Sequence, residues 1–272
     1  MISYGFLGAL TCPKKIPLVI SLHGSDILII PKRSWFHRQI AIFSLGRAKL
    51  ITSVAQHMTD VLHQYVSMNK SILTSQYGIN IHDFYPPNEV QPRLPIGLST
   101  RAMFKVSHLE VLLQSAANLK ELNFPLRFFL AGNGELQPSL EKLSIQLGIQ
   151  EMVRFVGQVP PQEMPSILRQ IAIYISTSVS DGTSLAMLEA MACGAFPVVT
   201  DIPANREWVD HGENGLLTQP GSSEDLAEKL MQAWNDEPLR RHAAAVNWDI
   251  VRERGDYHTN MQKIVKAFEN LL

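Results

Sequence analysis

The feature that most constrains this chain is a regular alternation of short, apolar, β-branched runs with longer segments of helical spacing. Strands that are buried on both faces have such continuous apolar sequences, because helical crossovers cover both sides of a parallel sheet. The alternation therefore predicts an α/β protein with doubly wound, Rossmann-like parallel sheets. The predicted strands are residues 16–22, 49–54 and 71–76, and then 95–100, 126–132, 153–157, 172–177 and 196–201.

A proline-rich segment divides these strands into two groups. Residues 84–95 (FYPPNEVQPRLP) hold four prolines in twelve positions, which is typical of a stiff linker. We therefore predict an N-terminal domain over 1–92, a second domain over 93–250 and a C-terminal helix over 251–272 that packs back on the first domain. The second domain, with five strands, reads as complete. The first, with three strands and its opening strand near residue 16, reads as incomplete.

Composition excludes several classes of protein. The chain has 272 residues, of which 46% are hydrophobic, so it can bury two ordinary cores. Its two cysteines, Cys12 and Cys193, are far apart and form no CxxC or Cys/His cluster, which argues against a disulfide framework or a zinc site and for a reducing cytoplasm. No apolar run approaches the ~20 residues that span a bilayer. We expect a soluble protein that is at most peripheral to a membrane.

Charge is unevenly distributed along the chain. Residues 1–95 hold nine Lys and Arg against four Asp and Glu, whereas the remainder is acidic. Within the basic part, residues 34–46 have helical spacing, with Trp35 and Phe36 beside Arg33 and Arg38. Such a helix can lie on the inner face of a membrane. The alternative is an ordinary helix that covers the sheet and a charge difference that is only solvated surface.

One strand-to-helix junction carries most of the chemistry. Residues 172–177 (AIYIST) read as a buried strand, and residues 185–192 are strong helix formers that Thr183 or Ser184 can cap. A helix that starts directly after a strand offers unpaired N–H groups to a phosphate at the carboxyl edge of the sheet. Glu189, about six residues into the helix or ~9 Å along its axis, would then lie near the next sugar of a nucleotide. The alternative is that the junction is purely structural, since every α/β protein has such junctions.

Two other strand ends carry polar residues. The strand over 16–22 delivers His23, Gly24 and Asp26 to its carboxyl end, where a lone His can be structural or catalytic. Gly132-Asn133-Gly134 follows another strand and gives a G-x-G, which is too short for a dinucleotide fingerprint.

Taken together, these motifs resemble the group 1, family 4 glycosyltransferases of the GT-B fold, in which two Rossmann-like domains face a nucleotide-sugar cleft. The resemblance rests on Asp181-x7-Glu189 followed by EAMACGAFPVVTD, NREWV and ENGLL. It covers nearly the whole chain. The opening SYGFLG looks like the middle of the family's first domain, so we expect roughly the first third of the usual members, with its Gly-rich acceptor loop, to be absent.

The resemblance implies roles for individual residues. The donor diphosphate would lie at the Gly182 turn, where Thr183, Ser184 and Leu185 offer backbone N–H groups, and Glu189 would hold the ribose diol. Asp181 would orient the transferred sugar, although it is one methylene shorter than the Glu of the family. Further donor-binding and catalytic positions are Arg101 and, one residue earlier than usual, Lys105 in STRAMFK, together with Gly132, Asn133 and the reaction-centre residue His23.

The resemblance also implies the reaction. The family transfers a sugar from a nucleotide-diphosphate donor with retention of configuration, and the acceptor would be a glycan, a lipid-linked sugar or a small molecule, as in polysaccharide biosynthesis. The chain has no D-x-D motif to hold a metal ion. The N-terminus of the helix and Arg101 would therefore stabilise the charge of the departing phosphate in place of a metal, and no cofactor is needed. We expect no nucleic-acid partner. Two alternatives remain, namely a non-catalytic nucleotide-sugar binder and a nucleotide-sugar epimerase of the same fold.

Overall fold

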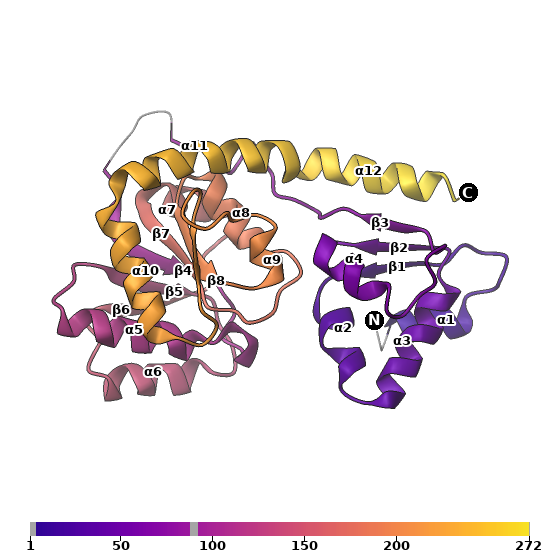
Figure 1. The fold of residues 1–272 in the computed structure, drawn as a ribbon, viewed down its shortest axis with the longest axis horizontal. Coiled ribbons are helices and arrows are strands. Elements are labelled where there is room, and N and C mark those ends of the chain that lie inside the picture. Colours follow the sequence, from indigo (N-terminus) through magenta and orange to yellow (C-terminus); the bar gives the residue numbers. More distant parts are fainter. Residues whose placement is uncertain (1–3, 88–91, 272) are drawn as a thin grey trace. The chain divides into compact units, whose positions relative to one another are not determined.

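Parallel sheets organise the computed structural model, which describes residues 4–87 and 92–271 (Figure 1). The chain divides into two units. The first comprises the described residues of Met1–Gly78, Ser180–Thr183 and Gly255–Leu272, and the second comprises those of Ile79–Val179 and Ser184–Arg254. The domains drawn from the sequence, 1–92, 93–250 and 251–272, have different bounds. Residues 88–91 of the expected linker lie outside the described residues.

The first unit is built on a three-stranded sheet in the order β1-β2-β3. All strands are parallel, with Ile20 opposite Ile51 and Ile51 opposite Ile72. Its core gathers Leu22, Ile51 and Met58, which are all fully buried. The strands are shorter than the apolar runs: β1 is Val19–Leu22, β2 is Leu50–Ser53 and β3 is Ile72–Thr74. The helical elements are α1 (Tyr4–Thr11), α2 (Ser25–Leu28), η1 (Ile30–Lys32), α3 (Trp35–Arg47), α4 (Gln56–Leu62) and α12 (Tyr257–Glu269).

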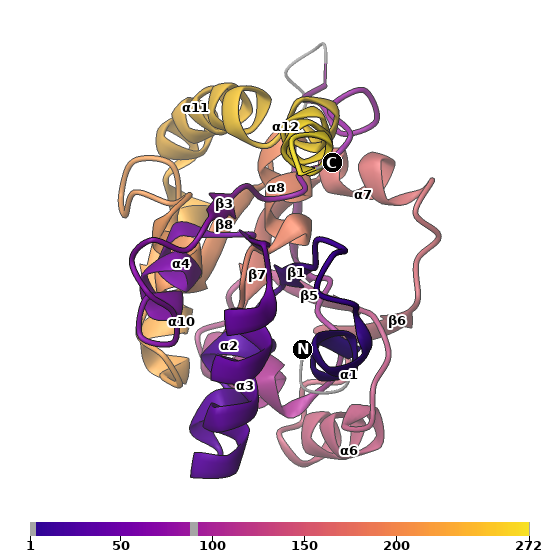
Figure 2. The same cartoon turned by 90° about the vertical axis from the view of Figure 1, so that its right-hand side faces the viewer.

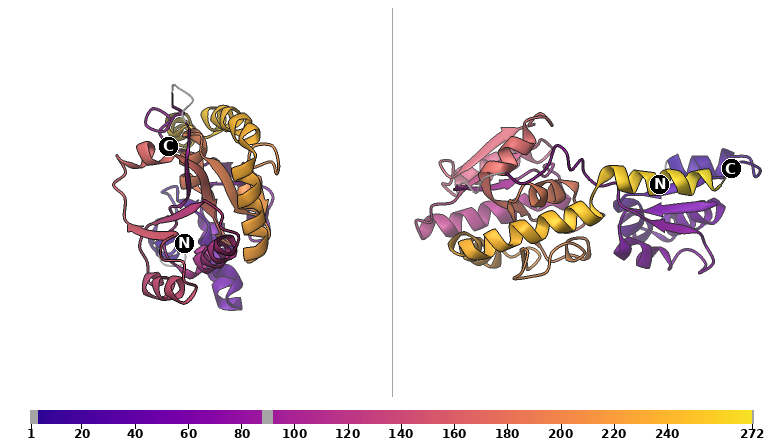
Figure 3. Two further views of the ribbon diagram at one scale, coloured as in Figure 1. Left: turned by 90° about the vertical axis from the view of Figure 1, so that its left-hand side faces the viewer. Right: turned by 90° about the horizontal axis from the view of Figure 1, so that it is seen from above.

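Helix α12 belongs to the first unit although it lies at the other end of the sequence, and it runs alongside the three-stranded sheet (Figures 1 and 3). Asp256 caps it by accepting a hydrogen bond from the Thr259 N–H at 2.9 Å. Just before this cap, the chain touches the end of the first segment. Gly78 has a φ of +83°, and a Cβ there would collide with the carbonyl oxygen of Gly255. A glycine is therefore required where the two segments meet.

The second unit has a six-stranded parallel sheet in the order β6-β5-β4-β7-β8-β9. Every residue of the central strands β7 and β8 is buried, as their continuous apolar sequences predict. The sixth strand, β9, was not predicted; it pairs Leu216 with Val198 of β8. The bounds are β4 Leu94–Ser99, β5 Arg127–Ala131, β6 Val153–Gly157, β7 Ile171–Ser176, β8 Phe196–Thr200 and β9 Leu216–Thr218.

Helices cover both faces of this sheet (Figures 1 and 3). One core cluster joins the sheet to α5, α6 and α10, and the other joins it to α7, α8 and α11. The helices are α5 (Leu109–Glu121), α6 (Gln137–Gln146), α7 (Met164–Gln170), α8 (Leu185–Ala192), α9 (Pro203–Arg206), α10 (Ser223–Asn235) and α11 (Glu237–Arg254), with the 3-10 turn η2 (Lys105–Ser107). Among the described residues, no helix combines the length and apolarity needed to cross a membrane.

Three helices begin later than the sequence predicted. We expected starts at Asn133, Pro161 and Thr183, but α6, α7 and α8 begin four, three and two residues further on, at Gln137, Met164 and Leu185. In α6 and α7 a proline stands in the first turn, where its missing N–H costs nothing. The connection between β6 and α7 is therefore an extended loop, which is visible in Figure 2.

Candidate functional site

The start of α8 forms the centre of the candidate site in the second unit. Ser184 is buried with extended backbone, and its Oγ accepts a hydrogen bond from the Met187 N–H at 3.3 Å. Of the two caps that the sequence allowed, the structure uses Ser184. The first N–H groups of a helix have no partner within it, so the turn at Leu185 presents donors and the positive end of the helix dipole.

Arg101 brings a cation to the same helix start. It lies two residues after β4, the direct neighbour of β7, whose following connection leads into α8. Its Nη1 donates to the Ser184 Oγ at 3.4 Å. A guanidinium beside a helix N-terminus makes a site for an anion such as a diphosphate. Lys105, in η2, has an exposed side chain.

The G-x-G after β5 supports the loop that carries Arg101. Met103 N–H donates to the Asn133 carbonyl at 3.0 Å, so the two loops are directly bonded. A Cβ on Gly132, whose φ is +133°, would lie 2.9 Å from the Arg101 carbonyl oxygen, and one on Gly134 would collide with the Met103 carbonyl oxygen. These glycines are explained by the close approach of two backbones.

Glu189 lies on α8, on the wall of a cavity of about 700 Å³ within the second unit. Burial raises the pKa of its carboxyl group to about 7, because the charged form loses water. The cavity also touches Thr100, next to Arg101, and thus connects the helix region with the end of β4. Its lining further comprises residues 82–85, Val159, Pro161, Gln162, Met164, Pro165, Arg169 and Ala186.

Sequence reasoning missed Tyr85 and Arg169 in this cavity. The Arg169 guanidinium carbon lies 4.7 Å from the centre of the Tyr85 ring, and its Nη1 donates to the Asp83 carbonyl at 3.3 Å. Tyr85 was noted only as part of the proline-rich linker, and Arg169 was not singled out. No local pattern joins residues this far apart in sequence.

In the first unit, His23 and the segment Ser180–Thr183 lie together. A Cβ on Gly182 would collide with the His23 carbonyl oxygen, and the Thr183 Oγ1 donates to the Val54 carbonyl at 2.9 Å. Asp181 accepts a hydrogen bond from the Gly182 N–H at 2.8 Å through its Oδ1. Thr183 is thus held by the end of β2, and its neighbour Ser184 caps α8.

Hydrogen bonds fix the residues after β1. The Asp26 carboxylate accepts from the N–H groups of His23 at 3.0 Å and Gly24 at 3.1 Å, and the His23 Nε2 lies 3.2 Å from the Tyr77 hydroxyl. His57, which was not predicted, has its Nε2 3.2 Å from the Asp181 carbonyl oxygen. His57 lies shortly after the carboxyl end of β2, a position that the rule for parallel sheets could have identified.

The NREWV and ENGLL motifs form a hydrogen-bonded support next to β8. The buried Asn205 donates to the Thr200 carbonyl at 2.7 Å. Asn214, also buried, donates to the side chain of Asn247 at 2.9 Å, and Asn247 donates back to the Asn214 carbonyl at 2.9 Å. Arg206 pairs with Asp201 at the surface. These contacts give the motifs a structural role.

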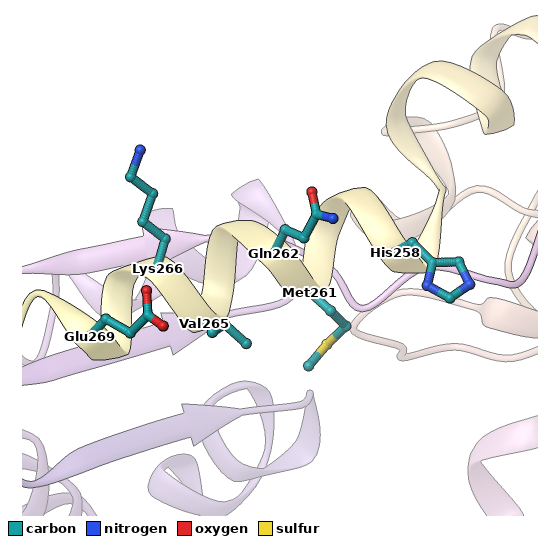
Figure 4. A pocket seen from close by; sticks show the side chains of 6 residues that line it. All are labelled: His258, Met261, Gln262, Val265, Lys266 and Glu269. Atoms are coloured by element: carbon teal, nitrogen blue, oxygen red, sulfur yellow. The ribbon is translucent and has the colours of Figure 1, made fainter.

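Another hollow, of about 470 Å³, lies on α12 and contains none of the predicted site residues (Figure 4). Six residues of this single helix line it, namely His258, Met261, Gln262, Val265, Lys266 and Glu269. Within the described parts of the chain, no group of three or more His, Cys, Asp or Glu could hold a metal ion.

Comparison with known families decides the relationship. The family described as glycosyl transferases group 1 matches residues 86–246, more than half of the chain, and the glycosyl transferase 4-like family matches residues 1–55. The chain belongs to the group 1 glycosyltransferases. The expected fold class is confirmed as well, since GT-B glycosyltransferase structures match it at TM-scores of 0.80 and above.

Individual relatives of this glycosyltransferase are distant. The N-acetyl-alpha-D-glucosaminyl L-malate synthase of Bacillus anthracis is 24% identical over 95% of the chain and 68% of its own length. The D-inositol 3-phosphate glycosyltransferase of Corynebacterium urealyticum is 30% identical over 74% of the chain and 53% of its own length. The chain thus spans between about half and two thirds of these relatives. Among solved structures, Anabaena Alr3699/HepE in complex with UDP matches with a TM-score of 0.85 and 20% identity, covering 99% of the chain and 77% of that protein.

Proposed function

We propose that this protein transfers a sugar from a nucleoside-diphosphate donor to an acceptor hydroxyl, with retention of anomeric configuration. The observation that carries the proposal is the arrangement around α8. Arg101 contacts the Ser184 cap at the helix start, and Glu189 lies further along the same helix on a cavity of about 700 Å³. Membership of the group 1 family supports it.

Each part of the donor has a proposed partner. The diphosphate would accept hydrogen bonds from the first N–H groups of α8 and from Arg101, and its charge would be favoured by the helix dipole. The ribose hydroxyls would donate to Glu189. Lys105, Gly132 and Asn133 would complete the surroundings, the last two by positioning the Arg101 loop. A relative of the same fold bound to UDP suggests a uridine nucleotide as the first probe.

The chemistry that we propose breaks the bond between the anomeric carbon and the diphosphate oxygen. The acceptor hydroxyl attacks the same face as the sugar develops oxocarbenium character, and its proton passes to the departing phosphate oxygen. Positive charge at the α8 start and on Arg101 stabilises that oxygen, which would let the reaction proceed without a divalent ion. His23 and Asp181 are assigned to the transferred sugar.

Nucleotide binding tests the donor site. Replacing Glu189 by Ala should weaken UDP binding by about 1.5–3 kcal/mol, because hydrogen bonds to a charged group in a partly buried site are lost. Calorimetry with the wild type and with a Glu228→Ala control, which alters an exposed carboxylate of the same unit on α10, measures the effect. Equal UDP affinities of the Glu189→Ala variant and the wild type would rule out the assignment.

Product analysis tests the reaction. The protein is incubated with a panel of nucleotide sugars, with and without glycan, lipid-linked and small-molecule acceptors, and the anomeric configuration of any product is read by NMR. An inverted product would refute retention. Nucleotide binding with neither transfer nor donor hydrolysis would favour a non-catalytic binder. Conversion of the donor alone into an isomer would indicate an epimerase.

We also propose that the first unit contacts the cytoplasmic face of an anionic membrane through α3. Trp35 and Phe36, at the helix start, are 74% and 64% exposed, and Arg33 and Arg38 flank them. Exposed aromatic rings beside cations suit an acidic lipid interface. Co-sedimentation with phosphatidylglycerol vesicles should capture the wild type, and a Trp35→Ala, Phe36→Ala double variant should bind several-fold less. Equal capture of both proteins would exclude this contact.

A further inference from the structure

We propose that Tyr85 is the platform on which the base of the bound nucleotide stacks, an inference that rests on the proposed donor site. Tyr85 and Glu189 line the same cavity of the second unit. The Tyr85 residue is 40% exposed, although its neighbour Phe84 packs against the core. An aromatic ring that remains accessible on a cavity wall is suited to receive another flat ring.

The Tyr85 ring stacks against Arg169, and the surroundings of both residues are fixed without a ligand. The Arg169 guanidinium carbon lies 4.7 Å from the ring centre, and the same guanidinium donates to the Asp83 carbonyl at 3.3 Å. The backbone of Tyr85 also lies next to the Cys193 thiol, at the end of α8. The platform is therefore tied to the end of α7 and to the end of α8 before any nucleotide arrives, which lowers the entropic cost of stacking.

The position of Tyr85 along α8 fits the length of a nucleotide. Ser184, Glu189 and Cys193 follow one another on this helix, at intervals of ~7.5 Å and ~6 Å along its axis. A diphosphate at Ser184 and a ribose at Glu189 would direct the base toward the Cys193 end, which lies next to the Tyr85 backbone.

The lining of the same cavity supports this placement. Besides Tyr85 it includes four apolar side chains from the β6–α7 connection and the start of α7, namely Val159, Pro161, Met164 and Pro165. A base in this part of the cavity would therefore meet an aromatic face together with apolar side chains, which favours a flat and largely apolar ring.

Stacking of this kind contributes affinity and does not read the identity of the base, because every base has a π-face. Tyr85 should therefore strengthen the binding of UDP and GDP by similar factors, and should leave the binding of inorganic pyrophosphate unchanged. This pattern separates a base contact from a contact with the diphosphate.

The test uses the full chain with Tyr85→Leu, which removes the aromatic face, and Tyr85→Phe, which keeps it. A matched control is Tyr257→Leu, because Tyr257 is 42% exposed and belongs to the first unit. Calorimetry should show UDP and GDP binding weakened roughly 5- to 150-fold in Tyr85→Leu, as expected for the loss of one stacked base. Tyr85→Phe and Tyr257→Leu should remain within about twofold of the wild type.

A second measurement detects the stack directly. Proton NMR of bound UDP should show the uracil H5 and H6 resonances shifted upfield by the tyrosine ring in the wild type and in Tyr85→Phe, and unshifted in Tyr85→Leu. UDP affinity of Tyr85→Leu within twofold of the wild type, or an equal loss of pyrophosphate binding, would overturn the inference while leaving the donor site intact. A wild-type protein that binds none of the common nucleoside diphosphates, UDP and GDP included, would refute the proposed function itself.

Discussion

Replacing Glu189 by Gln should stabilise the protein at neutral and alkaline pH. Burial raises the pKa of the Glu189 carboxyl group from its ordinary value of 4.5 to about 7. Because the folded state binds this proton more tightly than the unfolded state, the contribution to stability is fully present below pH 4.5 and is lost as the pH rises through 7. At 1.36 kcal/mol per pH unit, the loss amounts to about 3 kcal/mol at pH 8.

Urea unfolding at pH 5, 6, 7 and 8 measures this effect, with fluorescence of Trp208, Trp234 and Trp248 reporting on the second unit. Glutamine has no carboxylate to desolvate, so the free energy of unfolding of Glu189→Gln should exceed that of the wild type by a margin that grows with pH. Glu135→Gln, at an exposed position, controls for the loss of one charge. A constant difference across this pH range would refute the assignment of the cost to Glu189. The same variant should bind UDP more weakly, so that stability and donor binding change in opposite directions.

Three further outcomes follow from the contacts of the second unit. Gly134→Ala should displace the Met103 loop and weaken UDP binding together with thermal stability; unchanged values of both would show that the loops tolerate a methyl group. Asn247→Leu should lower the free energy of unfolding by about 1–3 kcal/mol, because the buried Asn214 loses its side-chain partner, and equal denaturation midpoints would contradict this. Glycosyl transfer should persist in EDTA, and a loss that Mg²⁺ restores would show that Arg101 and the α8 start do not suffice.

The central strands of the second unit can be predicted from the sequence, because the residues that favour a strand locally are also those that the core buries. The continuous apolar runs of β7 and β8 are buried over their full length, as in any central parallel strand. Strand β9 has only three residues and lies inside a segment whose sequence is typical of a loop. No repeat of apolar residues is therefore long enough to identify it as a strand. The late start of α6 also has a tertiary cause, since Gly134 is held against Met103.

The candidate site likewise has parts that the sequence predicts and parts that depend on tertiary contacts. Rules for helix caps and parallel sheets lead to the α8 start, but they cannot choose between Thr183 and Ser184. That choice is made by the carbonyl of Val54, which holds the Thr183 hydroxyl. Arg169 stacks on Tyr85, although the two residues are 84 positions apart along the chain. The sequence around neither residue predicts this contact.

The contact between Gly78 and Gly255 makes the second unit, in topological terms, a domain inserted into the first. Apart from residues 180–183, the chain leaves the first unit at one point and returns to it at the same point, so the ends of the insert are already held together. When the two ends of an inserted domain lie next to each other, the insert can be removed without disrupting the domain that contains it. A gene for residues 79–254 and another that joins Gly78 to Gly255 through a short linker would therefore separate the two units, except that residues 180–183 of the first unit would leave with the insert.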